Sequence, residues 1–220
     1  MHGLVKGKLP ILLASLIAIT KDNLKARLAY STVSQLSYIV LGALIATEVS
    51  ILGASMHIAM HAFAKITLFF AAGAILVAAH KTDVSQMHGL GRAMPITFTA
   101  FTLASLSIIG LPPFGGMWSK WYLALGTVET EQYILLAVLM ISSLLNIFYL
   151  LPVAIRAFFC KPKAGKPQVA NPQAAGQYTE IKEAPKPMLL ALSVTALVSI
   201  ALFFYPDPFY ELAAGAAKGP

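Results

Sequence analysis

The sequence is short of charge and of cysteine, and each shortage narrows what the chain can do. Only 11% of its 220 residues are charged, whereas 58% are apolar and the mean hydropathy is +0.74, well above the range of soluble domains. The single cysteine, Cys160, excludes a disulfide, a thiolate zinc site and a cysteine-ligated iron–sulfur cluster formed within this sequence. We therefore expect most of the chain to lie in a lipid bilayer, with no catalytic residue, redox centre or cofactor of its own.

Signals for binding nucleotides or nucleic acids are also missing. Neither a GxxxxGK loop nor a GxGxxG loop occurs in the sequence, so nucleotide binding is unsupported. The net charge of +7 could suggest a nucleic-acid partner, but phosphate binding requires a continuous basic face. The basic residues instead fall between apolar runs, as membrane topology requires. We therefore expect no nucleic-acid partner.

Six apolar runs predict an all-α, polytopic membrane bundle of about six transmembrane helices. A bilayer core of ~30 Å requires about 20 helical residues, which the second and sixth runs provide, while the third and fifth can tilt or extend past the lipid. The first run is too short, so either its helix begins within residues 1–8 or it is the remainder of a longer helix. A signal peptide is the alternative, although no clear cleavage site follows the run. The runs cover residues 9–20, 28–46, 51–79, 95–128, 132–159 and 188–206.

The fourth run contains a strong helix-breaking segment in its middle. Prolines remove backbone donors and glycines loosen the backbone, so we predict one helix broken at this point, with two separate short helices as the alternative. A loop at membrane depth is tolerated only where protein or a water-filled cavity covers it. The break consists of Gly110, Pro112, Pro113, Gly115 and Gly116.

The loops between the runs carry charges of alternating sign. Basic residues predominate after the first, third and fifth runs, and acidic residues predominate after the second, fourth and sixth. Under the positive-inside rule the basic loops face the cytoplasm and the carboxyl terminus lies outside. We divide the chain into a helix bundle over 1–159, a polar cytoplasmic loop over 160–187, and a final transmembrane helix with a short tail over 188–220.

Three ionisable residues in the third run, His57, His61 and Lys65, are spaced four and four. They lie on one helix face over about 12 Å. Each costs about 2.5 to 3.5 kcal/mol at membrane depth and is expected to face protein or a water cavity. Because burial disfavours the charged form of lysine and histidine titrates near neutral pH, this row could pass protons through waters. The alternative is that the histidines only bind neighbouring helices. A metal or haem site is disfavoured, because Lys65 would repel a cation.

Lys120 follows the helix break directly. A helix restarting there would present free amide donors and its positive end, which destabilise an ammonium group. The alternative is a lysine that snorkels to the interface between Trp118 and Trp121.

Lys25 precedes the second run and has two readings, a topological anchor and a part of the polar path. The polar residues that follow it could hold waters or bind a neighbouring helix, whereas for those of the fifth run we favour helix packing. These residues are Ser31, Ser34, Gln35 and Ser37 in the second run, and Ser142, Ser143 and Asn146 in the fifth.

Three ordered segments resemble one family, the proton-conducting membrane transporters. Residues 22–38, DNLKARLAYSTVSQLSY, are similar to its signature. Residues 57–65, HIAMHAFAK, resemble its HxxxHAFFK segment with Ala64 in place of the second phenylalanine, and residues 109–120, IGLPPFGGMWSK, resemble its broken helix with a terminal lysine. The family comprises antiporter-like subunits of respiratory complex I, which is the NADH:quinone oxidoreductase, and the large subunits, including the D type, of Mrp-type monovalent cation/proton antiporters.

The resemblance implies roles for the residues that match. Lys25, His57, His61 and Lys65 would belong to the central hydrophilic axis, and Lys120 would exchange protons with the far side. The chain would translocate protons, with or without exchange for sodium, in a bacterial-type inner membrane. The energy would come from the redox chemistry of partner membrane subunits, as in an NADH dehydrogenase complex, or from an ion gradient.

The matched region corresponds to only part of the family pattern. Family members carry two inverted five-helix repeats, and this chain resembles the second repeat followed by one helix. We therefore expect a fragment, the product of a split gene, or half of a two-chain unit. A truncated or structural subunit that does not conduct is the alternative function.

Overall fold

Helices form almost all of the chain in the computed structural model, which describes residues 2–161 and 183–217. Within these ranges the only β pairing is an isolated bridge between Asn23 and Asp83, so the predicted all-α fold is confirmed. In chain order the elements are α1 (His2–Thr20), α2 (Leu24–Ile45), α3 (Glu48–Ala79), the 3-10 turn η1 (Val84–Gln86), α4 (Leu90–Ala93), α5 (Pro95–Ile109), α6 (Gly116–Glu129), α7 (Tyr133–Phe159), α8 (Lys186–Phe204) and α9 (Asp207–Ala217).

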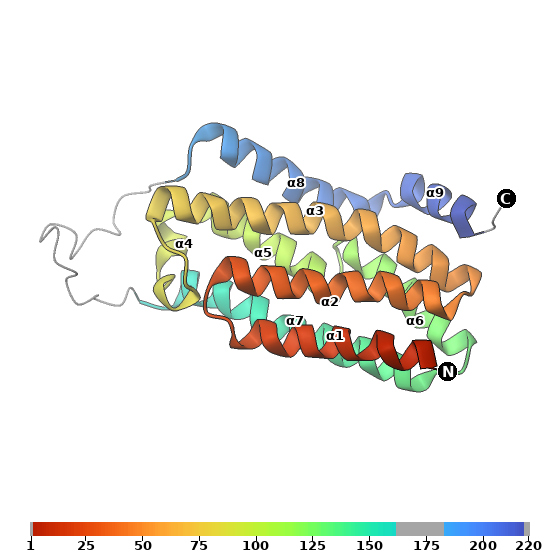
Figure 1. Ribbon diagram of the computed structural model, residues 1–220. Coiled ribbons are helices and arrows are strands. Elements are labelled where there is room, and N and C mark those ends of the chain that lie inside the picture. The colour runs from red at the N-terminus through yellow and green to blue at the C-terminus, as the bar shows by residue number, and fades with distance from the viewer. Residues whose placement is uncertain (1, 162–182, 218–220) are drawn as a thin grey trace, which may run out of the picture.

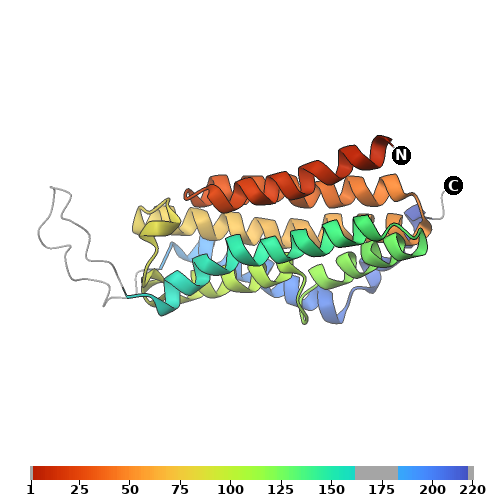
Figure 2. The ribbon, with the colours of Figure 1, turned by 90° about the horizontal axis from the view of Figure 1, so that it is seen from below.

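The six predicted runs correspond to α1, α2, α3, the pair α5 and α6, α7, and α8. These helices lie side by side along one long axis (Figures 1 and 2). In the described chain α2, α3, α7 and α8 are each long and apolar enough to cross a membrane, and α5 and the part of α1 from Pro10 to Thr20 are shorter apolar helices. Helix α1 begins at His2, before the apolar run over 9–20. This agrees with the expectation that the first helix begins within residues 1–8. The predicted short tail contains a further helix, α9.

Helix α3 is the central element of the bundle. It packs against α2, α5, α6, α8 and α9. Its start is fixed by a reciprocal pair of hydrogen bonds between Thr47 and Ser50, an arrangement that satisfies two free amides of the first turn. The polar residues of α3 are therefore surrounded by protein on several sides.

The break in the fourth run separates α5 from α6 where it was predicted. Gly110 ends α5 with φ at +91°, a backbone conformation that glycine adopts without strain. The amide of Gly115 donates to the carbonyl oxygen of Ser199 on α8 at 3.0 Å, and Phe114 is buried. Protein therefore covers this irregular segment, as a break at membrane depth requires.

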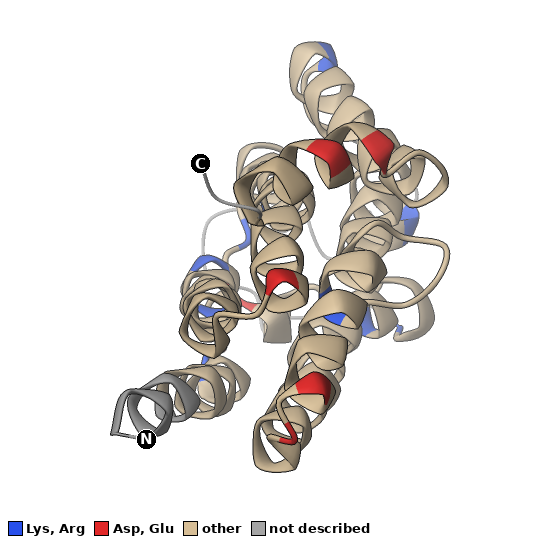
Figure 3. Cartoon of the chain, turned by 90° about the vertical axis from the view of Figure 1, so that its right-hand side faces the viewer, with Lys and Arg blue, Asp and Glu red and all other residues tan. Residues whose placement is uncertain are grey.

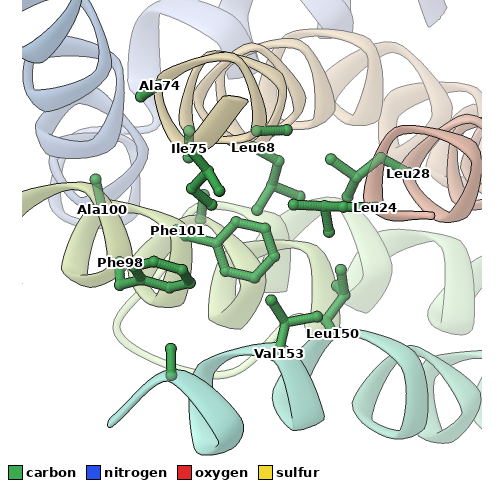
Figure 4. Close-up of a cluster of buried hydrophobic side chains, with 14 of the residues drawn as sticks. Leu24, Leu28, Leu68, Ala74, Ile75, Phe98, Ala100, Phe101, Leu150 and Val153 are labelled. Atoms are coloured by element: carbon green, nitrogen blue, oxygen red, sulfur yellow. The ribbon is translucent and has the colours of Figure 1, made fainter. Parts of the chain in front are cut away.

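One large apolar core holds α2, α3, α5 and α7 together near the end of the bundle where α2 begins (Figure 4). Leu28, Leu68, Phe101 and Leu150 come from these four helices and are each 0% exposed. Many large apolar side chains lie instead on the outer surface, such as Val40, which is 54% exposed. An outer surface of this kind suits a helix bundle surrounded by lipid.

Charged residues gather at the two ends of the bundle in the pattern that the loops predicted. Figure 3 views one end, where acidic residues predominate. The residues there are Glu48, Glu129, Glu131, Asp207 and Glu211, whereas Lys21, Lys25, Lys81, Arg92 and Arg156 lie on or beside the connections at the opposite end. Most of the predicted loop 160–187 lies outside the described residues.

We predict that the basic end faces the cytoplasm, which Cys160 can test because it is the only cysteine and follows α7 at that end. In sealed right-side-out vesicles a membrane-impermeant maleimide should leave Cys160 unlabelled. A Cys160→Ser, Glu129→Cys variant should be labelled, since Glu129 is exposed at the acidic end. The reverse labelling pattern would show that the orientation is inverted.

We also predict that Gly116→Ala destabilises the protein, because a Cβ atom there would overlap the backbone oxygen of Ser107. Overpacking of this kind costs about 1–3 kcal/mol or more. The control is Gly215→Ala in α9, where a Cβ atom meets nothing within 4 Å and alanine favours the helix. Thermal unfolding of the purified variants in detergent measures the difference, and equal stability of the two would contradict the tight crossing at the break.

Candidate functional site

Polar side chains from α2, α3, α6 and α7 meet inside the bundle. Helix α3 supplies His57, His61 and Lys65, which are only 2%, 7% and 5% exposed. The imidazole rings of His57 and His61 stack with their centroids 5.7 Å apart. The four-residue spacing therefore places the three residues on one buried face, as expected for a helix.

Lys65 reaches from α3 to α2. Its Nζ atom donates to the Ser31 hydroxyl at 2.7 Å and to the Leu28 carbonyl oxygen at 3.1 Å. Ser31 is 0% exposed, so the prediction that polar residues of the second run bind a neighbouring helix holds for this serine. Ser37, by contrast, bonds only the Val33 carbonyl of its own helix.

Lys120 lies one turn into α6 but its amine returns across the break to α5. Nζ donates to the carbonyl oxygens of Ile108 and Ile109 at 2.8 and 3.0 Å and to the Ser143 hydroxyl at 3.1 Å. With the amide oxygen of Asn146 on α7, which lies 3.2 Å away, four acceptors surround an amine that has three donors and share them. The carbonyls belong to the last turn of α5, the negative end of its dipole, and they favour the charged form.

The sequence analysis considered only the positive end of α6 and did not predict that the amine of Lys120 would bind the carbonyls at the negative end of α5. Side chains tilt toward the amino terminus of their helix, which directs Lys120 back over the break. Gly110 leaves room for it, since a Cβ atom there would lie 2.8 Å from the lysine Cδ atom. The snorkelling alternative fails, because Trp121 is 53% exposed and Trp118 donates to the Phe203 carbonyl oxygen at 2.9 Å.

His57 connects α3 to the same region of α6. Its Nδ1 atom lies 2.8 Å from the Ser119 hydroxyl, and its ring stacks on Tyr38 with centroids 5.6 Å apart. The amine of Lys120 lies 5.3 Å from the centroid of the Tyr38 ring. Tyr38 therefore lies against both the imidazole of His57 and the amine of Lys120.

Two buried ring nitrogens on this face have no hydrogen-bond partner among the described residues. They are the Nε2 atoms of His57 and His61, both buried. A buried polar atom without a partner costs about 1–3 kcal/mol, and such atoms commonly mark positions for ordered water. These two nitrogens are therefore candidate positions for bound water.

Helix α7 contributes two buried residues, Asn146 and Tyr149, which the sequence analysis did not place in the site. The Tyr149 hydroxyl lies 2.9 Å from the Ser31 hydroxyl. In the amide orientation that satisfies all its neighbours, Asn146 donates to that tyrosine oxygen, and its Oδ1 accepts from Lys120 at 3.2 Å and Gln35 at 3.1 Å. The three-residue spacing of Asn146 and Tyr149 on an apolar helix is the signal that could have revealed this face.

The favoured interpretation, that these polar residues bind neighbouring helices, holds for Ser143 and Asn146, which contact Lys120 on α6. It also holds for Ser142, whose hydroxyl lies 3.3 Å from that of Ser15 on α1 and 3.4 Å from that of Ser34 on α2.

Lys25 is exposed at the start of α2 and does not join the other predicted residues. The buried cation of this segment is Arg27, which donates to the carbonyl oxygens of Lys21 at 2.7 Å and Tyr149 at 3.2 Å. None of the buried residues in the described ranges is an aspartate or glutamate, and these ranges contain no cluster of histidine, cysteine and acidic residues that could hold a metal ion. The arrangement offers exchangeable protons on its lysine, histidine, serine and tyrosine side chains.

We predict that Ser119→Ala lowers stability by about 1–3 kcal/mol, because it leaves His57 with no partner on either ring nitrogen. The matched control is Ser37→Ala, which removes only a bond within its own helix. Thermal unfolding in detergent should show a loss for the first variant and little change for the second. Equal unfolding temperatures would contradict the bond between α3 and α6.

Comparison with known proteins identifies relatives across most of the chain. The family described as NADH:quinone oxidoreductase/Mrp antiporter, transmembrane, matches residues 4–146. NADH-quinone oxidoreductase subunit N of Desulforudis audaxviator is 37% identical over 197 residues, which cover 90% of this chain and 39% of that protein. The D-type subunit of the Na⁺/H⁺ antiporter of Alkalihalophilus pseudofirmus is 30% identical over 210 residues, covering 94% of this chain and 40% of that protein.

A solved structure supports the same fold. One chain of the Mrp complex from a Dietzia species superposes with a TM-score of 0.85 over 98% of this chain and 46% of its own length, at 23% identity. The chain thus spans less than half the length of these relatives. It belongs to the NADH:quinone oxidoreductase/Mrp antiporter family of membrane proteins.

Proposed function

We propose that this chain translocates protons as a membrane subunit of a complex I-like or Mrp-type assembly. The observation that carries the proposal is a pair of lysines that point into the bundle, Lys65, which is buried, and Lys120, which is partly buried, with no buried carboxylate in the described chain. Ionisable groups inside a membrane are costly and usually mark an ion or proton pathway. The family of the chain and the names of its relatives support the same reading.

In this proposal the two lysines hold protons and the histidines connect them. His61 lies within electrostatic reach of both Lys65 and Lys120, and His57 and His61 each present an unpartnered Nε2 atom. Waters bound to these atoms would complete a row of proton donors and acceptors between the two amines. Lys120 would exchange protons with the acidic, outer end of the bundle.

Lys25 takes a different position in the pathway from that of the other four residues, which lie inside the bundle. It is exposed at the basic end of the bundle, so it would meet water and protons before Lys65 does. Its side chain would then act at the mouth of the pathway rather than inside it.

The bundle over 1–159 would form the conducting unit, and other membrane subunits would supply the driving force. That force would be the oxidation of NADH by quinone in a complex I-like assembly, or a sodium gradient in an Mrp-type one. Both possibilities follow the names of relatives, and a bacterial-type inner membrane is the expected location.

Lys65→Met tests the proposal. We expect proton transport to fall at least tenfold, because methionine cannot hold a proton. Stability should be retained, because the groups that accept hydrogen bonds from Lys65 still have other donors. Ser31 still pairs with the Tyr149 hydroxyl, and the Leu28 carbonyl still accepts from Thr32 at 2.9 Å. Replacing a buried charge with an apolar residue of similar volume is often neutral or stabilising.

The measurement uses the assembly purified from its native membranes and reconstituted in liposomes that contain a pH-sensitive dye. NADH and quinone drive transport if redox subunits co-purify, and a sodium gradient drives it if they do not. Lys81→Met, in the connection after α3, is the matched control and should transport normally. Full transport by an intact Lys65→Met assembly would overturn the proposal and favour a structural subunit that does not conduct.

A further inference from the structure

A continuous chain of hydrogen bonds that includes neither histidine joins Lys65 to Lys120. Lys65 donates to Ser31, Ser31 pairs with the Tyr149 hydroxyl, Tyr149 pairs with the Asn146 amide, and Asn146 accepts from Lys120. The three linking side chains are each 0% exposed. They come from α2 and α7, whereas the lysines come from α3 and α6.

The direction of the hydrogen bonds in this chain depends on the orientation of the Asn146 amide, which places its oxygen toward the donors Lys120 and Gln35. Asn146 donates its amide hydrogen to the tyrosine oxygen, so the hydroxyl hydrogen of Tyr149 points to the Ser31 oxygen. Lys65 donates to the same serine oxygen at 2.7 Å. Two donors, the Tyr149 hydroxyl and the Lys65 amine, therefore meet at one acceptor.

The amide of Asn146 interrupts this chain for protons. An amide accepts at oxygen, donates at nitrogen and has no proton that titrates in the physiological range. A serine or tyrosine hydroxyl can accept one proton while releasing another, but an amide cannot readily do so. The chain can therefore transmit polarisation between the lysines without carrying the transported proton.

We infer that Ser31, Tyr149 and Asn146 form a positioning bridge that makes the protonation of Lys65 and the protonation of Lys120 oppose each other. The inference rests on the proposed function. When Lys120 is charged it polarises the Asn146 amide, which strengthens the bond to Tyr149 and then the bond from Tyr149 to Ser31. The Ser31 oxygen is then a poorer acceptor for the ammonium group of Lys65. The charged form of one lysine therefore disfavours the charged form of the other, so the two lysines hold a proton alternately.

Other titratable groups face the bridge from the helices around it, and each must stay unchanged in a test. Helix α5 contributes none, only the Ile108 and Ile109 carbonyls that bind Lys120. The groups are Arg27 and Tyr38 on α2, His57, His61 and Lys65 on α3, and Lys120 on α6.

The test compares two variants that act on the Ser31 oxygen in opposite ways. Tyr149→Phe removes the competing donor, so Ser31 accepts from Lys65 more readily. The alkaline limb of the pH–rate profile should therefore shift to higher pH. Ser31→Ala removes the acceptor itself, so the alkaline limb should shift to lower pH. A hydrogen bond to a charged group is large enough for a shift of about one pH unit in each direction.

Proton transport by the reconstituted assembly is measured as a function of pH for both variants, beside Lys65→Met. The control is Tyr133→Phe, since Tyr133 lies on the same helix and is 63% exposed; its profile should equal that of the unaltered chain. A fall of Tyr149→Phe to the level of Lys65→Met would overturn the inference, because the tyrosine would then carry the proton.

Two further outcomes bear on the bridge. Shifts of the same sign, or no shift in either variant, would also overturn it. If Tyr149→Phe does not assemble, a downward shift in Ser31→Ala with retained transport supports the bridge, and an unchanged profile overturns it. Normal transport by Lys65→Met would instead mean that the proposed function itself fails.

Discussion

The placement of two amines inside the bundle, one buried and one partly buried, without a buried carboxylate is the constraint that organises the described part of this structure. Every acceptor of Lys65 and Lys120 is a backbone carbonyl, a hydroxyl or an amide. Neutral acceptors lower the cost of burying an ammonium group but do not bind it as a carboxylate would. An amine held in this way can lose its proton without leaving a negative charge stranded in the bundle, which is what a relay group requires.

The helix break is the source of the acceptors for one of these amines. In an unbroken helix the carbonyls of Ile108 and Ile109 would bond to amides in the next turn. The break frees them, and the restart of α6 at Gly116 brings Lys120 back over them. The close approach at Gly116, where a Cβ atom would contact the Ser107 oxygen, is part of the same geometry. Glycine and proline here position a charge as well as bending a helix.

Much of the fold could be predicted from the sequence because it depends on local patterns. Hydropathy and the four-residue spacing located the helices, the break and the row His57, His61 and Lys65. The direction of Lys120 was missed because its acceptors lie on α5, across the break. Tyr149 was missed for a similar reason, since its partner Ser31 lies 118 positions away. No local pattern showed that Arg27, rather than Lys25, is the buried cation of α2, because only the packing of α7 against α2 decides it.

Arg27 differs from the lysines of the site because its charge is permanent. A guanidinium group stays charged in proteins, so Arg27 cannot relay a proton. It donates to the backbone oxygen of Tyr149 at 3.2 Å, and the hydroxyl of the same tyrosine contacts Ser31. Both contacts join α2 to α7. The bond from Arg27 therefore helps to hold Tyr149 in place, and the hydroxyl of Tyr149 contacts Ser31, which accepts from Lys65. A fixed cation near the basic end thus aligns the neutral groups to which the amine of Lys65 is bound.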